Sequence, residues 1–580
     1  MLRGSRGDRP GNQPHPGRDG IENGGEFLRR LLQLLHDLDG KPYGQLRRIY
    51  GDHADRDMAL VVDHVQGDPY ANASRLHLEL PPQFHPNLAL PQDAFERLAM
   101  EDLFLREFAR RLPEESLPAG DGGGGRLRTA RPDATIRPRS AAQMGKLLTL
   151  RFSYAFPAQN RRILAEPVAE VLANRLPALA LDIANGVTRE RILELAQHLR
   201  KRQMVREAMS ASGIVAFLPE GSCVRREESG AASPKAVRLA LPTELSTTLS
   251  LADGSTLSGL AIRKGVTVLV GSAFHGKTTF LEALETCRAD VGPSDGLALA
   301  CSTRRTETVT VEEDRRVGTC DLSPFFRRLP GQDPSRFSVD EASGATSQAA
   351  NLVESLTCGS ELLLIDEDAS AANFLTRDPI ISRLLPEGES VVPLADRCAE
   401  LDARGVSMVV VAGASSQWLS VADQVMVLAR FQPQDATAKA RTVAPVAGEK
   451  PPACDWDVVL GDQLMEQWKE LASVPATKLK VQDGIVRFAK AAESRLPRRF
   501  ASDDTLRGAA HLLCQWMRHC RDRNLPPTRK GLVAYLDERR LAADPWGHAV
   551  GHDLAFPTGR ESWALWTRMK AGSGEAEDED

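Results

Sequence analysis

The chain has 580 residues and a formal net charge of −5. That length exceeds what one hydrophobic core usually organises, so we expect two to four domains. Hydrophobic residues make up 42% of the chain and charged residues 26%, which excludes a wholly disordered or collagen-like protein. The slightly acidic balance also excludes a protein that binds nucleic acid over its whole surface, and only a local basic patch is compatible with it.

The sequence indicates an intracellular protein without a membrane partner. No apolar run reaches the roughly 18 residues that a membrane-spanning helix needs, and the N-terminal residues lack the apolar core of a secretory signal. The nine cysteines, from Cys223 to Cys520, include no C-x-x-C pair, so neither a disulfide framework nor a zinc site is indicated. We expect reduced thiols and a cytoplasmic location, with a mitochondrial one as the alternative.

The N-terminal part of the chain alternates helical and strand patterns. Residues 27–39 place leucines at three-to-four-residue spacing before a glycine, which predicts an amphipathic helix. Residues 58–81 alternate apolar and polar side chains around a Gly-Asp-Pro turn, which predicts a pair of strands. The helical pattern of residues 188–210 begins at Thr188, a residue type that caps helices. We predict that residues 25–210 form one α/β domain.

The middle of the chain has the pattern of a mostly parallel α/β sheet. Continuous apolar, β-branched runs alternate with helical segments over residues 211–435, and such runs indicate strands covered on both faces. The expected strands are GIVAFLP, GVTVLVG, ELLLID, VSMVVVAG and QVMVLA. The remaining segments are predicted to be a disordered tail over 1–24, a Gly-rich loop over 119–140, a mainly helical C-terminal region over 436–570 and an acidic tail over 571–580.

The strongest chemical signal is G-x-x-x-x-G-K-T, from Gly271 to Thr278, between an apolar strand and a helix. In that context the backbone N–H groups of the loop surround a phosphate, and the alternative is a chance match in a turn. Lys277 would neutralise the β- and γ-phosphate oxygens, and the Thr278 hydroxyl would ligate Mg²⁺. The expected cofactors are therefore ATP and Mg²⁺. The residues predicted to hold the nucleotide from this loop are Gly271, Ser272, His275, Gly276, Lys277, Thr278 and Thr279.

Two carboxylates, Asp366 and Glu367, follow the apolar strand ELLLI. Ligands of open α/β sheets collect at the carboxyl ends of such strands. We expect Asp366 to hold Mg²⁺ and Glu367 to polarise the attacking water as a general base, so that Lys277 and Glu367 are the predicted catalytic residues. Standing alone, the pair would be interpreted as solvated acids at a strand end.

A third segment, ASGATSQ, opens a predicted helix at residues 342–348. Ser343 precedes Asp366 by 23 positions (366 − 343). The alternative is an ordinary helix start, because Ser, Gly and Thr are common at that place. Downstream of Glu367, the segment DASAAN ends at Asn373.

Taken together, these motifs resemble the family called predicted ATPases of the ABC class. The resemblance rests on DHVQGDPYANASR, GIVAFLPEGS, KGVTVLVGSAFHGKTTFLEALE, ASGATSQAANLVE, LLLIDEDASAANFLTRD and VADQVMVL, and it covers about residues 27 to 435. It implies an ABC-type P-loop core with an added N-terminal α/β domain, and ATP hydrolysis without a transporter partner. RNA binding is the role usually suggested for the family.

The resemblance also implies that two chains share each ATP site. In ABC proteins a Ser-Gly-Gly-Gln signature contacts the γ-phosphate bound by the opposite subunit, which points to Ser343, Gly344 and Gln348. Asn373 stands in the segment similar to the D-loop, where most ABC proteins carry Asp at the dimer interface. One chain contains one phosphate loop and one signature, so a homodimer is expected.

Two features depart from the family pattern or add to it. The strand VSMVVVAG is followed by Ala, Ser, Ser and Gln instead of the usual switch histidine, and Ser415, Ser416 and Gln417 are candidates to replace it. The basic runs 199–206 and 495–499 are candidate phosphate-backbone contacts, with solvated helix faces as the alternative. The expected function is an ATP-dependent homodimeric clamp acting on RNA or another nucleic acid. The alternative is an ATP-binding regulatory or scaffold module with negligible turnover.

Overall fold

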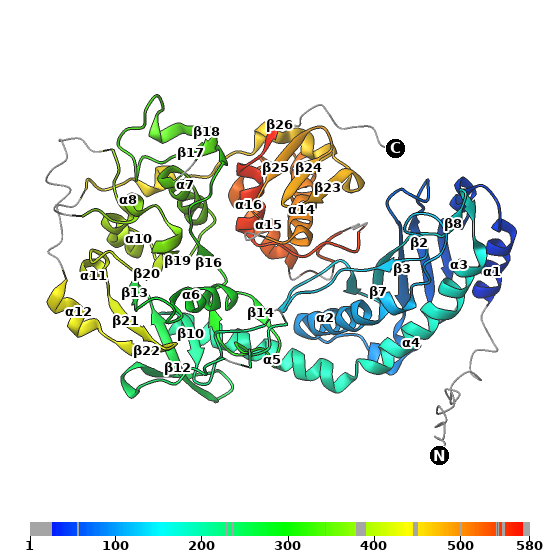
Figure 1. Cartoon of the computed structure of the whole chain (residues 1–580), viewed down its shortest axis with the longest axis horizontal. Helices are drawn as coiled ribbons and strands as arrows, with labels where there is room; N and C mark the ends of the chain where they lie inside the picture. Colours follow the sequence, from blue (N-terminus) through cyan, green and yellow to red (C-terminus); the bar gives the residue numbers. More distant parts are fainter. Residues whose placement is uncertain are drawn as a thin grey trace, which may run out of the picture.

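The protein is arranged in three parts, which Figure 1 shows from blue at the N-terminus to red at the C-terminus. The computed structural model describes residues 26–54, 57–227, 229–234, 236–342, 344–378, 390–444, 451–497, 501–540, 542, 544–547 and 551–571. Most of the two predicted tails therefore lies outside the described residues. Each part has a hydrophobic core of its own. We propose that the domain boundaries lie near residues 210 and 435.

The N-terminal part is an antiparallel sheet covered by helices. Its elements are α1 (Glu26–Leu38), β1 (Gly51–Ala54), β2 (Ala59–His64), β3 (Ser74–Leu80), α2 (Ala94–Arg111), β4 (Leu127–Arg128), β5 (Thr135–Ile136), β6 (Ala142–Met144), β7 (Leu148–Tyr154), β8 (Ala158–Gln159), β9 (Arg162–Ile163), α3 (Ala165–Ala169) and α4 (Leu176–Gly186). The sheet order is β1-β2-β3-β7-β4, with β6 also paired to β7. The predicted helix α1 and the predicted β2–β3 pair are both confirmed.

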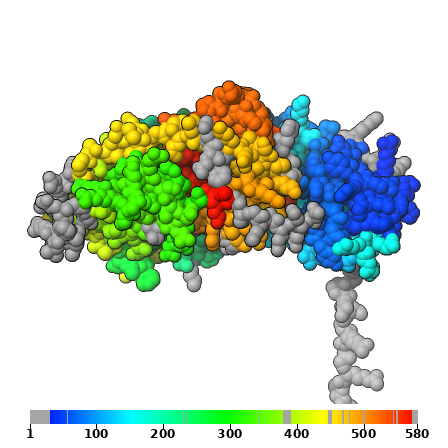
Figure 2. Space-filling view, turned by 90° about the horizontal axis from the view of Figure 1, so that it is seen from above, coloured from blue at the N-terminus to red at the C-terminus, as the bar shows by residue number. Residues whose placement is uncertain are grey.

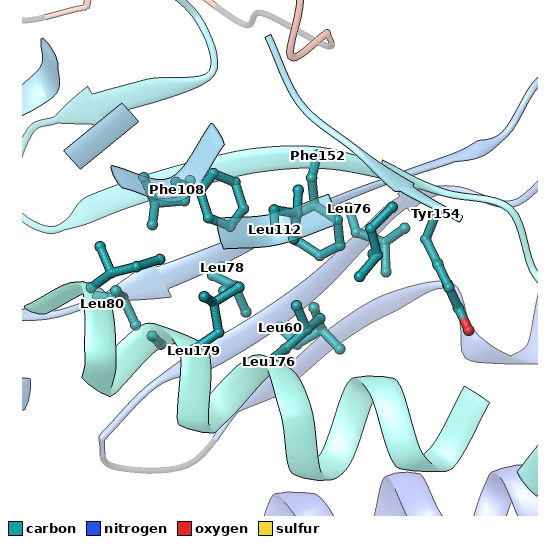
Figure 3. Close-up of a cluster of buried hydrophobic side chains, with 14 of the residues drawn as sticks. Leu60, Leu76, Leu78, Leu80, Phe108, Leu112, Phe152, Tyr154, Leu176 and Leu179 are labelled. Atoms are coloured by element: carbon teal, nitrogen blue, oxygen red, sulfur yellow. The ribbon is translucent and has the colours of Figure 1, made fainter. Parts of the chain in front are cut away.

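Alternation along β3 sets the core of this part. Leu76, Leu78 and Leu80 point to one face of the sheet and are buried, whereas the residues between them are half-exposed. Figure 3 shows these leucines facing Leu176 and Leu179 of α4. The amphipathic patterns of strand and helix therefore meet in one buried layer.

The Gly-rich segment 119–140 is mostly loop, as predicted, but it is packed. A Cβ added at Gly125 would lie 1.7 Å from the carbonyl oxygen of Leu117, and its φ of +79° also favours glycine. Within this segment β4 joins the N-terminal sheet, and β5 pairs with Asp290 and Val291 of the central part. The segment thus connects two parts of the molecule.

The central part is built on a six-stranded sheet. Its elements, with the helix that leads into it, are α5 (Arg189–Ala211), β10 (Ile214–Pro219), β11 (Ser246–Ser250), β12 (Thr256–Arg263), β13 (Val266–Val270), α6 (Lys277–Thr286), β14 (Asp290–Val291), β15 (Cys301–Ser302), β16 (Thr306–Thr308), β17 (Arg315–Cys320), β18 (Phe337–Ala342), α7 (Gly344–Thr357), β19 (Leu362–Asp366), α8 (Ala372–Leu375), α10 (Cys398–Ala403), β20 (Ser407–Val411), α11 (Trp418–Val421), β21 (Gln424–Ala429), β22 (Gln432–Asp435) and α12 (Thr437–Val443). The order is β16-β19-β20-β13-β21-β22, and only β22 runs antiparallel.

Four of the five predicted strands lie in this sheet, and the fifth does not. Strand β10 belongs to a separate antiparallel sheet of order β11-β12-β10-β15. Ala216 and Leu218 pack on one side of that sheet, whereas Phe217 packs against Val205 and Met209 of α5 on the other. A continuous apolar run therefore indicates burial on both faces and does not establish parallel pairing.

The C-terminal part is mainly helical, as expected, with a small sheet that the sequence analysis missed. Helix α13 (Trp456–Val459) comes first but packs into the core of the central part through Trp456 and Val459. The elements of the C-terminal part are β23 (Leu479–Gln482), β24 (Ile485–Phe488), β25 (Ala492–Arg495), α14 (Asp503–Arg523), α15 (Arg529–Arg540), α16 (Gly559–Thr567) and β26 (Lys570–Ala571). Strands β23 and β24 form a hairpin whose two-residue turn is Asp483-Gly484, both with positive φ. Asp-Gly is a strong hairpin signal that was present in the sequence. Among the described residues, no helix combines the length and apolarity needed to cross a membrane.

Helix α5 carries one of the basic runs, and its interpretation as a phosphate contact is wrong for two arginines. Arg202 is fully buried and donates to the carbonyls of Cys287, Leu297 and others in the same loop. Arg206 is also buried and pairs with Asp290 at 2.7 Å. Burial opposes ionisation of Asp290, but the surrounding arginines outweigh it and lower the pKa of that carboxyl. The run joins α5 to the segment that follows α6.

We predict that Arg202→Met lowers the free energy of unfolding by about 1–3 kcal/mol, because the Ala298 carbonyl loses its donor and three other carbonyls each lose one of their donors. Urea unfolding followed by tryptophan fluorescence measures the change.

The matched control is Arg200→Met, which removes the ion pair with the exposed Asp93 and should cost at most about 1 kcal/mol. The buried Glu96, 3.6 Å from Arg200, keeps its closer partner Arg189 at 2.8 Å. Equal losses in the two variants would contradict the buried role of Arg202.

Candidate nucleotide site

The predicted phosphate loop lies between β13 and α6 at the carboxyl edge of the parallel sheet. A Cβ at Gly271 would approach the carbonyl oxygen of Leu428 to 2.6 Å, and one at Gly276 would approach the Phe431 ring to 2.2 Å. Both glycines are therefore required by their neighbours. Lys277 Nζ donates to the carbonyls of Gly271 (2.7 Å) and Ser272 (3.2 Å), so its ammonium group lies within the loop.

His275 and Phe431 connect the loop to the chain that follows β21. His275 Nδ1 accepts from the Arg430 N–H at 3.4 Å, and the Phe431 N–H donates to the His275 carbonyl at 3.2 Å. His275 therefore packs the loop against a turn. Sequence reasoning missed Phe431, because its contact with Gly276 joins residues far apart in the chain. Ser272 in the loop is exposed, and Thr279 in the first turn of α6 is half-buried.

The two residues predicted to hold Mg²⁺ lie together. Thr278 Oγ1 donates to Asp366 Oδ2 at 2.8 Å, and the other Asp366 oxygen accepts from the Asp368 N–H at 3.1 Å. Asp366 ends β19 and is 5% exposed. A hydroxyl and a carboxylate beside a phosphate loop match the oxygen ligands that Mg²⁺ prefers, so these residues fit the ion.

Glu367 is held by the loop that follows β20. Its carboxylate accepts from the N–H groups of Gly413, Ala414 (2.8 Å) and Ser415 (3.1 Å). Successive backbone N–H groups of this kind form an anion-binding nest. The position expected for a switch histidine is thus occupied by a loop that binds the predicted base. Ser415 Oγ donates to Thr376 Oγ1 at 2.9 Å, so its hydroxyl also has a local partner.

The predicted signature residues do not share one environment. Ser343 lies outside the described residues, and Gly344 begins α7. Gln348 is fully buried: its Nε2 donates to Ser370 Oγ at 2.7 Å, and its Oε1 accepts from the Ala371 N–H at 2.8 Å. Both polar ends of the Gln348 side chain thus have partners within the chain, and its contact with a partner's ATP stays a prediction. Its side chain holds the D-loop-like segment, whereas Asn373 in α8 is exposed.

A phosphate loop after one parallel strand and an acid pair after another define a P-loop nucleotide site. Residues 28–186 match the family described as the N-terminal region of ATPases of the ABC class, and residues 188–454 match the P-loop domain of ABC ATPases. The chain belongs to the family of ABC-class ATPases, as the sequence resemblance predicted. The mixed α/β fold class is also confirmed.

Individual proteins share only a low sequence identity with this chain. An uncharacterized protein of Methanocaldococcus jannaschii, MJ1628, is 26% identical over 230 residues, which are 37% of this chain and 51% of that protein. The chain thus spans about half the length of this curated relative. Two solved structures of MJ1267, an ATP-binding cassette of an ABC transporter, are 11% identical. They cover 40% and 32% of this chain and 94% and 87% of theirs, with TM-scores of 0.24 and 0.22, too low to carry an argument.

We predict that Asp366→Ala weakens Mg²⁺ binding in the presence of ATP by about 10- to 100-fold, because a carboxylate beside the ion is lost. Titration of ATP affinity at increasing Mg²⁺ measures it, and excess Mg²⁺ should restore part of the binding. Asp368→Ala, an exposed carboxylate at the same strand end, is the control and should bind as wild type does. A normal Mg²⁺ dependence in Asp366→Ala would refute this role.

Proposed function

We propose that the chain is an Mg²⁺-dependent ATP hydrolase that works as a homodimeric clamp. The observation that carries the proposal is the 2.8 Å hydrogen bond from Thr278 to Asp366, which places two oxygen ligands beside the Lys277 loop. Family membership supports hydrolysis of ATP as the activity of the core. Electrostatic stabilisation is the main catalytic contribution in phosphoryl transfer, and this arrangement provides it.

Each residue has a defined task in this proposal. Lys277 exchanges its two carbonyl partners for phosphate oxygens, which are stronger acceptors because they are charged. Thr278 and Asp366 would hold Mg²⁺, and the bound ion would offset the negative charge of the phosphate oxygens. The Glu367 carboxylate first leaves the N–H groups of residues 413–415, and it then orients and deprotonates the attacking water.

The dimer is proposed because the site needs groups from two chains. Gly344, the first residue of α7, and Ser343, which precedes it in the sequence, would contact the γ-phosphate of the partner's ATP. Asn373 is exposed on the segment similar to the D-loop, where it is free to meet the other chain. Action on RNA or another nucleic acid rests on the family resemblance alone. Arg202 and Arg206 are buried, and residues 498 and 499 of the second basic run lie outside the described residues.

A specific observation favours the second candidate, an ATP-binding module with negligible turnover. The predicted base, Glu367, has three backbone N–H partners in the 413–415 loop, and that loop contains no histidine. If this arrangement persists with ATP bound, no base is available to the attacking water. The intact Lys277, Thr278 and Asp366 favour the hydrolase.

The substitution Glu367→Gln distinguishes the two candidate functions. For the hydrolase, removal of the base should slow hydrolysis by ~10²- to 10⁴-fold while ATP still binds. Light scattering in excess ATP and Mg²⁺ should then show a longer-lived dimer than wild type forms. Glu361→Gln makes the same substitution at an exposed position directly before β19, at the opposite end of that strand, and should behave as wild type does. Equal dimer lifetimes, with negligible phosphate release from wild type, would leave only the binding module.

Complementation tests whether the sites are shared between chains. Ser343→Arg and Lys277→Ala should each be inactive alone, because each spoils both sites of its homodimer. Mixed in equal amounts, they form heterodimers with one intact site, so about a quarter of wild-type activity should return if subunits exchange freely. Phosphate release before and after mixing measures the restored activity. The control is Ser338→Arg, at an exposed residue of β18. A mixture that stays inactive although heterodimers form would contradict the shared site.

A further inference from the structure

A buried ionic cluster joins the C-terminal part to the signature helix α7. Arg568, directly after α16, donates to Glu312 Oε2 at 2.8 Å, to Glu354 Oε2 at 2.9 Å and to Asn351 Oδ1 at 3.0 Å. Arg315 reaches the same Glu354 at 2.6 Å. The side chains of Arg568, Arg315 and Glu354 are 1–2% exposed. Figure 2 shows the red C-terminal segment against the green central part.

The members of this cluster are charged and depend on one another. Burial would raise the pKa of Glu312, but Arg568 and Arg315 outweigh it and hold that pKa at about 2. Burial likewise opposes ionisation of Glu354, and the same arginines lower its pKa. A buried ion pair that loses one partner leaves an uncompensated charge, so the cluster resists separation of α16 from α7.

The cluster continues through α7 toward the nucleotide site. Arg315 donates to the Ser347 carbonyl at 3.1 Å, and Ser347 Oγ accepts from the Glu312 N–H at 3.1 Å. The next residue, Gln348, holds Ser370 and Ala371, and Ser370 Oγ donates to the carbonyl of Asp366 at 2.7 Å. Hydrogen bonds therefore connect the cluster around Arg568, along one helix, to the strand end that carries the predicted Mg²⁺ ligand.

A second set of buried hydrogen bonds joins α16 to the six-stranded sheet of the central part. Arg560 Nη1 donates to Glu307 Oε2 at 3.0 Å and to the Thr308 carbonyl at 3.1 Å. Both acceptors lie in β16, which pairs with β19. Thr567 Oγ1 donates to Glu354 at 2.8 Å. Two ends of one short helix are thus fixed to the central part, one at the sheet and one at α7.

We infer that the C-terminal part sets the position of the signature helix, with Arg568 as the positioning residue. The inference rests on the proposed function, because α7 begins next to Ser343 and would present the signature to the partner's ATP. The network reaches Asp366 only at its backbone carbonyl, and the Asp366 carboxylate keeps its separate bond from Thr278. A change that moves α16 would therefore alter hydrolysis on the partner chain and leave the P-loop's own affinity for ATP unchanged.

The experiment compares Arg568→Gln with the milder Arg568→Lys and with a matched control. Lys keeps the charge but cannot serve two carboxylates in the forked geometry of Arg. The control, Arg518→Gln, removes hydrogen bonds to the carbonyls of Ala472 and Val474 within the C-terminal part. Amide hydrogen exchange of α7 measures its ordering, and kcat and the Kd for ATP of the full-length protein measure the consequence.

We expect faster exchange of α7 in Arg568→Gln, kcat lowered by about 2- to 30-fold, and an unchanged Kd for ATP. Arg568→Lys should lie between this variant and wild type, and Arg518→Gln should leave α7 exchange and kcat unchanged. Unchanged α7 exchange in both Arg568 variants, or faster exchange with a normal kcat, would overturn the inference. Loss of ATP binding together with kcat would also overturn it. Absence of turnover in wild type would instead overturn the proposed function, and the inference with it.

Discussion

One hydrogen bond, from Thr278 to Asp366 at 2.8 Å, joins the two strand ends around which the nucleotide site is built. It depends on parallel pairing, because β13 and β19 are separated only by β20 and end at the same edge of the sheet. Residues 88 positions apart thereby meet as neighbours. The close approach of Leu428 and Phe431 to the loop glycines then fixes the loop against β21 and the turn after it.

Buried arginines join the parts of the molecule at several junctions. Arg139 pairs with Asp504 between the N-terminal and C-terminal parts, Arg202 joins α5 to the segment after α6, and Arg568 joins the C-terminal part to α7. A guanidinium group has five N–H donors in a rigid plane, so one side chain serves several carbonyls and carboxylates at once. In the basic run 199–206, two of the four basic residues, Arg202 and Arg206, are therefore internal.

Features set by neighbouring residues could be predicted from the sequence. Helix α1, the β2–β3 pair, the Thr188 cap and the loop between β13 and α6 each follow from a contiguous pattern. Features set by distant residues could not. The burial of Gln348 depends on Ser370, and the environment of Glu367 depends on residues 413–415. The β23–β24 hairpin is an exception: its Asp-Gly turn is a local signal for a hairpin, yet no hairpin was predicted there.

The two predicted catalytic residues, Lys277 and Glu367, already have hydrogen-bond partners inside the chain. To act on a nucleotide, each must give up these partners for new ones. For Lys277 the exchange is favourable, because charged phosphate oxygens replace neutral carbonyls. For Glu367 it is not, because a carboxylate gains nothing by leaving three N–H donors to approach an anionic triphosphate. ATP alone therefore gives no reason for Glu367 to move. In the proposed clamp, its release would require groups from the partner chain, and dimer closure would then be the step that separates binding from hydrolysis.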